Sequence, residues 1–309
     1  MTDLVVTGSA GSAGIGAGAD ILALGAVTAL VTVAAAVRGI WSPCGLSMVS
    51  AINPFTERSR GNRYWLTALW FTAGSVLGGA MLGALAAVGA VLWGSLAGSV
   101  AVSVSVAAGV GSVGCLVAAA SDSSRVRFRL PGHPRQVNEQ WLGRYRRWVY
   151  ACGFGVQIGV GFATYIMTAA VYLTVLLGAL SASPATAFAV GLLFGLVRGL
   201  AVLLSSGARD PAALRRLHRR LDLLAPWSWR AVMLIEAAGA AVLGYAAAGM
   251  VGLALVAAPV VGVLMFAGSR TRQRHREASV PDSRPEPAVS QSEPAVSTDR
   301  YSPVPSRRR

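Results

Sequence analysis

Two cysteines, Cys44 and Cys152, lie in apolar segments that also contain helix-breaking residues. Pro43 directly precedes Cys44, and Gly153 and Gly155 follow Cys152. A thiol pair of this kind could cycle between dithiol and disulfide by exchange with other thiols. Counted from the ends of their segments, the two depths differ by roughly 10 Å, and by less if the first segment is broken or tilted. The pattern therefore allows a redox pair, with a small packed apolar residue as the alternative for each cysteine.

The remaining cysteine and the histidines give no metal-binding pattern. Cys115 has no helix-breaking neighbours and is expected to be a packed apolar residue. The three histidines fall in polar loops or in the tail, away from the cysteines (His133, His218 and His275). No Cys/His cluster has the spacing of a zinc or haem site. We expect neither a metal nor a cofactor.

Two charged residues lie inside apolar segments. Arg198 is about seven residues from the cytoplasmic end of its segment, and Glu236 is at a similar depth in the next. Because an unpaired charge at such a depth costs at least ~2.5 kcal/mol, the spacing suggests an ion pair. The pair could form a proton- or anion-linked binding site with Gln157 nearby. Alternatively it fixes the helix register, or Arg198 extends to the inner surface.

The composition assigns the chain to the membrane class. Hydrophobic residues make up 54% of the 309 residues and charged residues 13%, about half the share usual in soluble domains. The net charge is +14 and all basic residues are arginine. These arginines fall in short loops between apolar runs and in the tail, which is typical of cytoplasmic loops of membrane proteins and does not require a nucleic-acid partner. The expected partner is the lipid bilayer.

Apolar runs of about the length that crosses ~30 Å of hydrocarbon recur along the chain. We predict an all-α polytopic membrane bundle of about seven spans, with segments at 21–55, 65–92, 95–120, 148–180, 185–205, 229–248 and 250–268. The first six form a 3+3 inverted repeat, with halves of about 21–120 and 148–248. The segment 250–268 is an additional span.

The charged loops predict the orientation. If each segment crosses once, the arginines collect in 56–64, 121–147, 206–228 and the tail. The positive-inside rule then places the N-terminus outside and the C-terminus in the cytoplasm of the cell membrane. Residues 1–20 are expected to be a flexible extracytoplasmic lead, and 269–309 a disordered basic tail. Asp210 and Pro211 predict the start of a basic amphipathic helix in the third of these loops.

Small residues and helix breakers mark the functional spans. Glycines at four-residue spacing favour close helix packing (Gly74/Gly78, Gly79/Gly83, Gly155/Gly159 and Gly191/Gly195/Gly199). The first and fourth segments exceed 30 residues and should be interrupted, the first at Pro43 and Pro54. Broken helices at corresponding positions of two halves indicate a site near the membrane midplane.

Ser42-Pro43-Cys44 in a long first span, a short arginine-containing loop and a Gly-rich second span resemble the CcdA/DsbD-type membrane electron carriers. The resemblance covers about residues 25–248. It implies two inverted three-helix repeats, each with one redox cysteine. It also implies a cytoplasmic thioredoxin-like donor and an extracytoplasmic thiol acceptor, as in cytochrome c biogenesis. Departures are Gly45-Leu46-Ser47 where the family has another proline, and Ala151 before Cys152.

Three functions remain open from the sequence. The first is a membrane thiol–disulfide oxidoreductase that uses Cys44 and Cys152 as its catalytic residues. The second is a small-solute transporter that uses the broken spans with Pro43, Gln157 and the Arg198/Glu236 pair. The third is a non-catalytic accessory subunit of the membrane.

Overall fold

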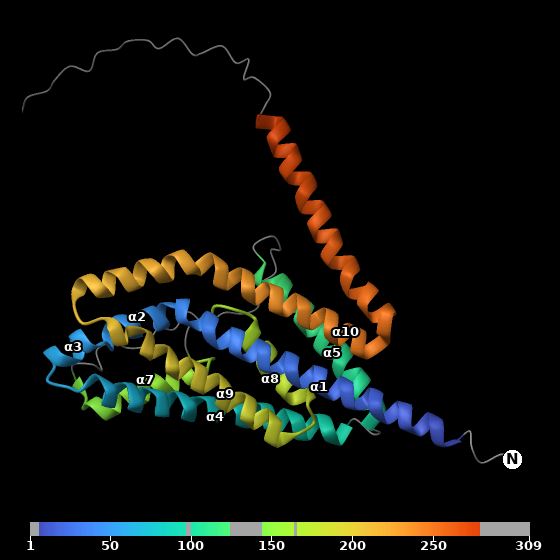
Figure 1. Cartoon of the computed structure of the whole chain (residues 1–309), viewed down its shortest axis with the longest axis horizontal. Helices are drawn as coiled ribbons and strands as arrows, with labels where there is room; N and C mark the ends of the chain where they lie inside the picture. Colours follow the sequence, from blue (N-terminus) through green and yellow to red (C-terminus); the bar gives the residue numbers. More distant parts are fainter. Residues whose placement is uncertain (1–5, 97–99, 124–143, 164–165, 279–309) are drawn as a thin grey trace, which may run out of the picture. The chain divides into compact units, whose positions relative to one another are not determined.

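The computed structural model describes residues 6–96, 100–123, 144–163 and 166–278, and every regular element in these ranges is helical. The predicted all-α class is therefore confirmed. The elements, as labelled in Figure 1, are α1 (Val6–Arg38), η1 (Gly39–Trp41), α2 (Pro43–Ala51), α3 (Pro54–Ser59), α4 (Tyr64–Leu96), α5 (Val100–Asp122), α7 (Arg147–Gly159), α8 (Ala170–Leu180), α9 (Pro184–Leu200), η2 (Ala201–Gly207) and α10 (Pro211–Ala278).

Five helices in the described residues are long and apolar enough to cross a membrane. They cover Gly18–Trp41, Tyr64–Leu96, Val104–Asp122, Pro184–Gly207 and Pro211–Ala258. The last of these is 48 residues long, more than twice what one crossing needs. The count of about seven spans, the inverted repeat and the orientation stay predictions.

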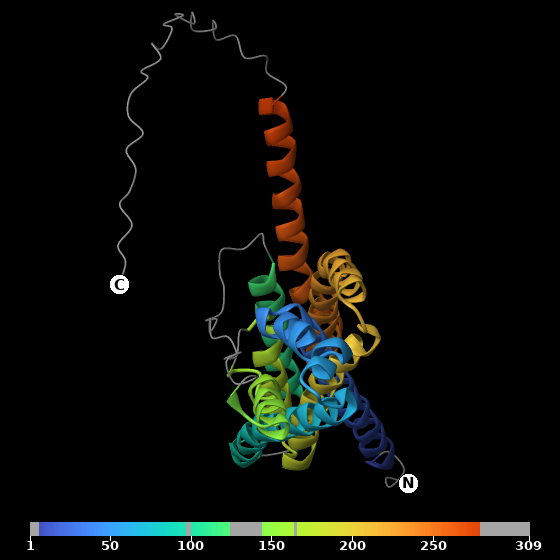
Figure 2. The same cartoon turned by 90° about the vertical axis from the view of Figure 1, so that its left-hand side faces the viewer.

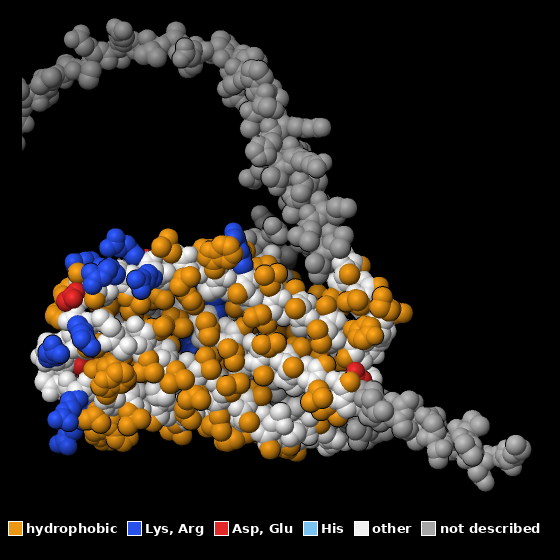
Figure 3. All heavy atoms as spheres, viewed as in Figure 1, with side chains coloured by type: hydrophobic (Ala, Val, Ile, Leu, Met, Phe, Trp, Pro, Cys, Tyr) orange, Lys and Arg blue, Asp and Glu red, His pale blue; other side chains and the backbone are white. Residues whose placement is uncertain are grey.

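The outer surface of the helices is apolar. Leu69, Leu77 and Leu85 of α4 are more than half exposed, as are Leu223 and Leu234 of α10. Figure 3 shows hydrophobic side chains over the long sides of the helices, whereas arginines gather at the end where α2, α3 and the start of α10 lie. A soluble protein rarely exposes so continuous an apolar surface, so the distribution is that of a lipid-facing bundle with one charged end.

The first predicted interruption is confirmed. The chain leaves α1 through η1 and then starts α2, with Ser42 as its N-cap and Pro43 at its first position. The N–H of Gly45 donates to the Ser42 hydroxyl at 3.0 Å, and this hydroxyl donates to the Gly39 carbonyl at 2.7 Å. A second start follows at Pro54, where Asn53 and Thr56 form a capping box. Each proline thus begins a short helix, where its missing N–H costs least.

The predicted fourth segment is also broken, but later than its glycines suggested. Residues around Cys152 are helical in α7, and the interruption follows Gly159, with Gly161 at a φ of 76°. The helix α8 resumes at Ala170. The earlier glycines are accommodated within α7 because they serve helix packing. Neither α7, with 13 residues, nor α8, with 11, is long enough to cross a bilayer alone.

The most extensive packing among the described helices joins α4 to α9 and to α7 (Figures 1 and 2). The predicted glycine stripes make these contacts. On one face of α4, a Cβ at Gly74 or Gly78 would lie less than 3.0 Å from the α7 backbone. On the other, a Cβ at Gly79 would lie as close to the backbone of Gly191 and Gly195. The prediction of tight glycine packing is confirmed, and α4 uses one stripe for each neighbour.

The long helix α10 contains both a predicted cap and a sharp bend. The Asp210 carboxylate accepts the N–H of Ala213 at 2.6 Å, which confirms it as the N-cap. The backbone is non-helical at Ala248 and Gly249, with Gly249 at φ 59° and ψ −137°. A Cβ at Gly252 would lie less than 3.0 Å from the Gly244 carbonyl, eight residues earlier, so the chain folds back on itself there. The bend falls between the last two predicted apolar segments, 229–248 and 250–268.

The terminal regions differ in part from expectation. The helix α1 already begins at Val6, within the stretch expected to be a flexible lead. The helix α10 continues to Ala278, beyond the predicted start of the tail at residue 269. Arg, Gln and Glu without proline favour helix at the second site, whereas the first site holds five glycines among residues 6–20 and has no such local support. Residues 1–264 form one compact unit and 265–309 a second. The loop 124–143 and the tail from 279 lie outside the described residues.

Candidate functional site

The broken first segment places Cys44 in the first turn of α2. Because Ser42 caps this helix, Cys44 is its second residue, and its side chain is only 1% exposed. The unpaired N–H groups of a helix N-terminus carry partial positive charge and favour negative charge nearby. The position therefore differs from that of a cysteine in the middle of a span.

The side chain of Arg198, from α9, lies close to Gly39 and Cys44. It is buried, with 6% exposed, and its Nε has no hydrogen-bond partner. A Cβ at Gly39 would lie less than 3.0 Å from its Nη1 and Cζ, so the guanidinium fills the space that a side chain at Gly39 would need. The guanidinium carbon is 5.8 Å from the ring centroid of Phe194. Cys44 is close enough to interact with this charge electrostatically.

A small cavity lies beside the guanidinium. Its volume is about 20 Å³, enough for one water-sized particle. The lining includes Gly45 of α2, Phe71 of α4, Ile158 of α7, and Arg198. The cavity thus lies where both interrupted segments meet α4 and α9, and its surroundings are apolar apart from Arg198. We call these residues, together with Gly39 and Cys44, the Arg198 site.

The structure brings Cys44 and the helix of Cys152 into one cluster. Cys44 packs in the same buried group as Ala151 and Phe154 of α7. Cys152 itself is half-buried, and its backbone is the part of α7 that contacts Gly74. Cys44 and Cys152 are not joined by a disulfide in this structure. Pro43 acts as the first residue of α2, and Gln157 is half-buried on α7 but does not line the cavity.

The predicted ion pair between Arg198 and Glu236 is wrong. Glu236 is 1% exposed, and neither of its carboxylate oxygens has a hydrogen-bond partner. Glu236 interacts electrostatically with Asp122 and Cys115. Arg198 interacts electrostatically with Cys44 instead. Equal depth in neighbouring helices does not fix the rotation of each helix about its axis, and here the two charged side chains face different neighbours. Cys115 is fully buried, in line with its expected packing role.

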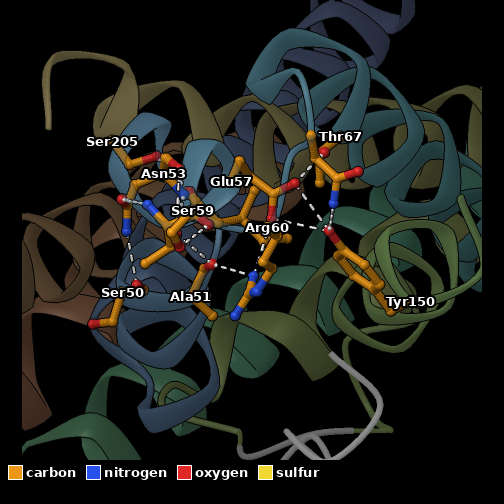
Figure 4. A network of polar contacts seen from close by, with 12 residues as sticks. Ser50, Ala51, Asn53, Glu57, Ser59, Arg60, Thr67, Tyr150 and Ser205 are labelled. Atoms are coloured by element: carbon orange, nitrogen blue, oxygen red, sulfur yellow. Dashed lines mark hydrogen bonds and ion pairs between the residues drawn. The ribbon is translucent and has the colours of Figure 1, made fainter. Parts of the chain in front are cut away.

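A second polar group, which the sequence analysis missed, surrounds Glu57 of α3 (Figure 4). The fully buried carboxylate accepts the Tyr150 hydroxyl at 2.9 Å and the Thr67 hydroxyl at 2.6 Å. Arg60 forms an ion pair with it at 3.0 Å, and the amide of Asn62 donates to the Tyr150 oxygen at 3.3 Å. This network, here called the Glu57 network, joins α3, α4 and α7. The signal in the sequence was an acid in the first turn of the helix that Asn53 and Pro54 begin.

A third polar group ties the end of α5 to its neighbours. The Asp122 carboxylate accepts hydrogen bonds from the Thr168 hydroxyl and from the Ala169 N–H, the latter at 2.8 Å. The Trp229 indole donates to the Asp122 carbonyl at 2.8 Å. These bonds cap the start of α8 and hold α10 against α5. Among the described residues, no three His, Cys, Asp or Glu side chains are grouped as metal ligands.

The apolar helices and the broken segments around a buried charge define an all-helical, multi-pass membrane protein. Comparison with known proteins adds the family. Methylamine utilization protein MauF of Paracoccus denitrificans is 30% identical over 203 residues, which is 65% of this chain and 71% of that protein. The chain belongs to the MauF family.

Two further relatives carry the same name. MauF of Paracoccus versutus is 30% identical over 181 residues, covering 57% of this chain and 63% of that protein. MauF of Methylorubrum extorquens is 28% identical over 210 residues, covering 67% and 70%. No protein-family model matches the chain, and no solved structure matches it. The resemblance to CcdA/DsbD-type carriers stays a prediction, since these relatives bear a different name.

Proposed function

We propose that this chain is a membrane-embedded accessory protein of methylamine utilization. The observation that carries the proposal is the 30% identity to MauF of Paracoccus denitrificans over 71% of that protein. One feature of the chain supports a role in the bilayer, because its long apolar helices match a membrane location.

Deleting the gene for this chain from its host is expected to abolish growth on methylamine. Growth on ammonium and an ordinary carbon source should be unchanged, because the proposed role is confined to one substrate. The measurement is growth rate on each medium, with the gene restored on a plasmid as the control. Undiminished growth of the deletion strain on methylamine would contradict the proposal.

A second candidate is thiol–disulfide exchange by the same protein. It is favoured by Cys44 at the N-terminus of α2, beside the positive charge of Arg198. It is also favoured by the packing of Cys44 with residues that flank Cys152. In this mechanism the two thiols are oxidised to a disulfide as an outer disulfide is reduced, and an inner dithiol then restores them. The solute-transporter alternative keeps its broken spans but loses its charged pair, because Arg198 and Glu236 do not form an ion pair.

Mild oxidation of intact membranes is expected to protect Cys44 and Cys152 from alkylation together. Replacing either one by serine should make the other reactive again, because the disulfide can no longer form. The measurement is mass-tagged alkylation after denaturation, with Cys115→Ser as the control that leaves the protection intact. If Cys44 and Cys152 still react fully after oxidation, this candidate is excluded.

A further inference from the structure

The buried charge of Arg198 has no carboxylate partner among the described residues. Glu236, the acid expected to neutralise it, faces Asp122 and Cys115 instead. An ion pair between Arg60 and Glu57 is found among the described residues, but it lies in the Glu57 network. A cation that is 94% buried in apolar surroundings requires a compensating negative charge nearby.

Two positive groups converge on the cavity beside Arg198. One is the guanidinium, whose Nε is buried without a hydrogen-bond acceptor. The other is the N-terminal turn of α2, which supplies Gly45 to the lining. It contributes the partial positive charge of the helix end, whereas the Gly45 N–H itself already donates to the Ser42 hydroxyl. Proteins commonly bind anions with helix N-termini and with arginine guanidinium groups.

The size of the cavity limits what it can hold. A volume of about 20 Å³ accommodates one water-sized particle and no organic molecule. The remaining walls, which include Phe71, Ile158 and Val202, are apolar and supply no further charge. A small monovalent anion would neutralise Arg198 without leaving a second charge unpaired.

We propose that the Arg198 site binds one small monovalent anion of the size of chloride. The anion lies between the Arg198 guanidinium and the N-terminus of α2, in the cavity that Gly45 and Phe71 help to line. Gly39 is a positioning residue, because only a residue without a side chain leaves room for the guanidinium. The inference is independent of both proposed functions, since it depends on charge and space alone.

The test is equilibrium binding of radioactive chloride to the purified full-length protein in detergent. The wild-type protein is expected to show one saturable site per chain, from which bromide displaces chloride but gluconate does not, because gluconate is too large for the cavity. Arg198→Gln should weaken binding by roughly tenfold or more, since the charge-assisted contact is lost. Arg216→Gln, which removes an exposed arginine of α10, should bind like the wild type.

Two further variants keep the proposal testable if Arg198→Gln fails to fold. Arg198→Lys retains the charge but not the planar guanidinium group with its several N–H donors. It should therefore bind chloride more weakly than the wild type and more strongly than any neutral variant. Gly39→Ala retains Arg198 but displaces its guanidinium, so its affinity should also fall. The absence of saturable chloride binding in the wild type, or unchanged affinity in both Arg198→Lys and Gly39→Ala, would overturn the proposal.

Discussion

Replacing Gly191 with alanine is expected to separate α9 from α4 and to prevent most of the protein from folding stably. A Cβ at this position would lie less than 3.0 Å from the N and Cα of Gly83 and from the carbonyl of Gly79. All three are backbone atoms of α4, so no side-chain rotation can relieve the overlap. Overpacking of this kind costs roughly 1–3 kcal/mol, and more where the backbone itself must move.

The effect should spread beyond the glycine contact, because hydrogen bonds depend on the same helix spacing. The Ser75 hydroxyl donates to the Gly195 carbonyl at 2.7 Å, and the Thr72 hydroxyl donates to the Gly199 carbonyl at 3.3 Å. Both bonds lengthen if the helices move apart. The measurement is the melting temperature of the purified protein in detergent, together with the monodisperse fraction in size-exclusion chromatography.

Gly25→Ala on α1 provides a matched control. It makes the same substitution in a membrane-spanning helix, but a Cβ at Gly25 has no atom within 4 Å. Because alanine is the better helix former by about 1 kcal/mol, this variant should melt at or above the wild-type temperature. Equal melting temperatures for the two variants would show that α4 and α9 do not approach as closely as their glycines suggest.

Much of this architecture follows from local sequence. Prolines at positions 43 and 54 begin helices because a helix tolerates proline only in its first turn. Glycines at four-residue spacing lie on one side of a helix, so stripes such as Gly79/Gly83 predict a close neighbour without naming it. Asp210 is recognisable as an N-cap from the proline that follows it. Each of these features depends on a few adjacent residues.

Contacts between segments that are far apart in the sequence were harder to predict. The depth of Arg198 could be counted along the chain, but its direction is set by the rotation of α9 and by the space at Gly39, about 160 residues earlier in the sequence. The break in the fourth segment shifted to Gly161 because packing against α4 stabilises the glycines before it. The Glu57 network joins three helices, and no pattern within one helix reveals such partners.

Replacing Glu57 with alanine is expected to destabilise the protein by about 3 kcal/mol or more, the usual cost of removing one partner from a buried charged network. The substitution leaves the hydroxyls of Tyr150 and Thr67 without their acceptor in a buried site. Arg60 is about one-third exposed, so water can compensate its charge, and most of the loss should come from the two hydroxyls. The measurement is the melting temperature in detergent, with Arg58→Ala, an exposed neighbour on α3, as the control.

A double-mutant cycle shows whether the network joins α3 to α7. Tyr150→Phe removes one donor and should cost about 1.5–3 kcal/mol, as for other hydrogen bonds to charged groups. Because both substitutions break the same contact, the double variant should lose less stability than the sum of the two single losses, with a coupling of roughly 0.5–3 kcal/mol. Strict additivity would mean that Tyr150 and Glu57 do not interact in the folded protein. A measured coupling would show that the end of the interrupted first segment is held against α7, the helix that carries Cys152.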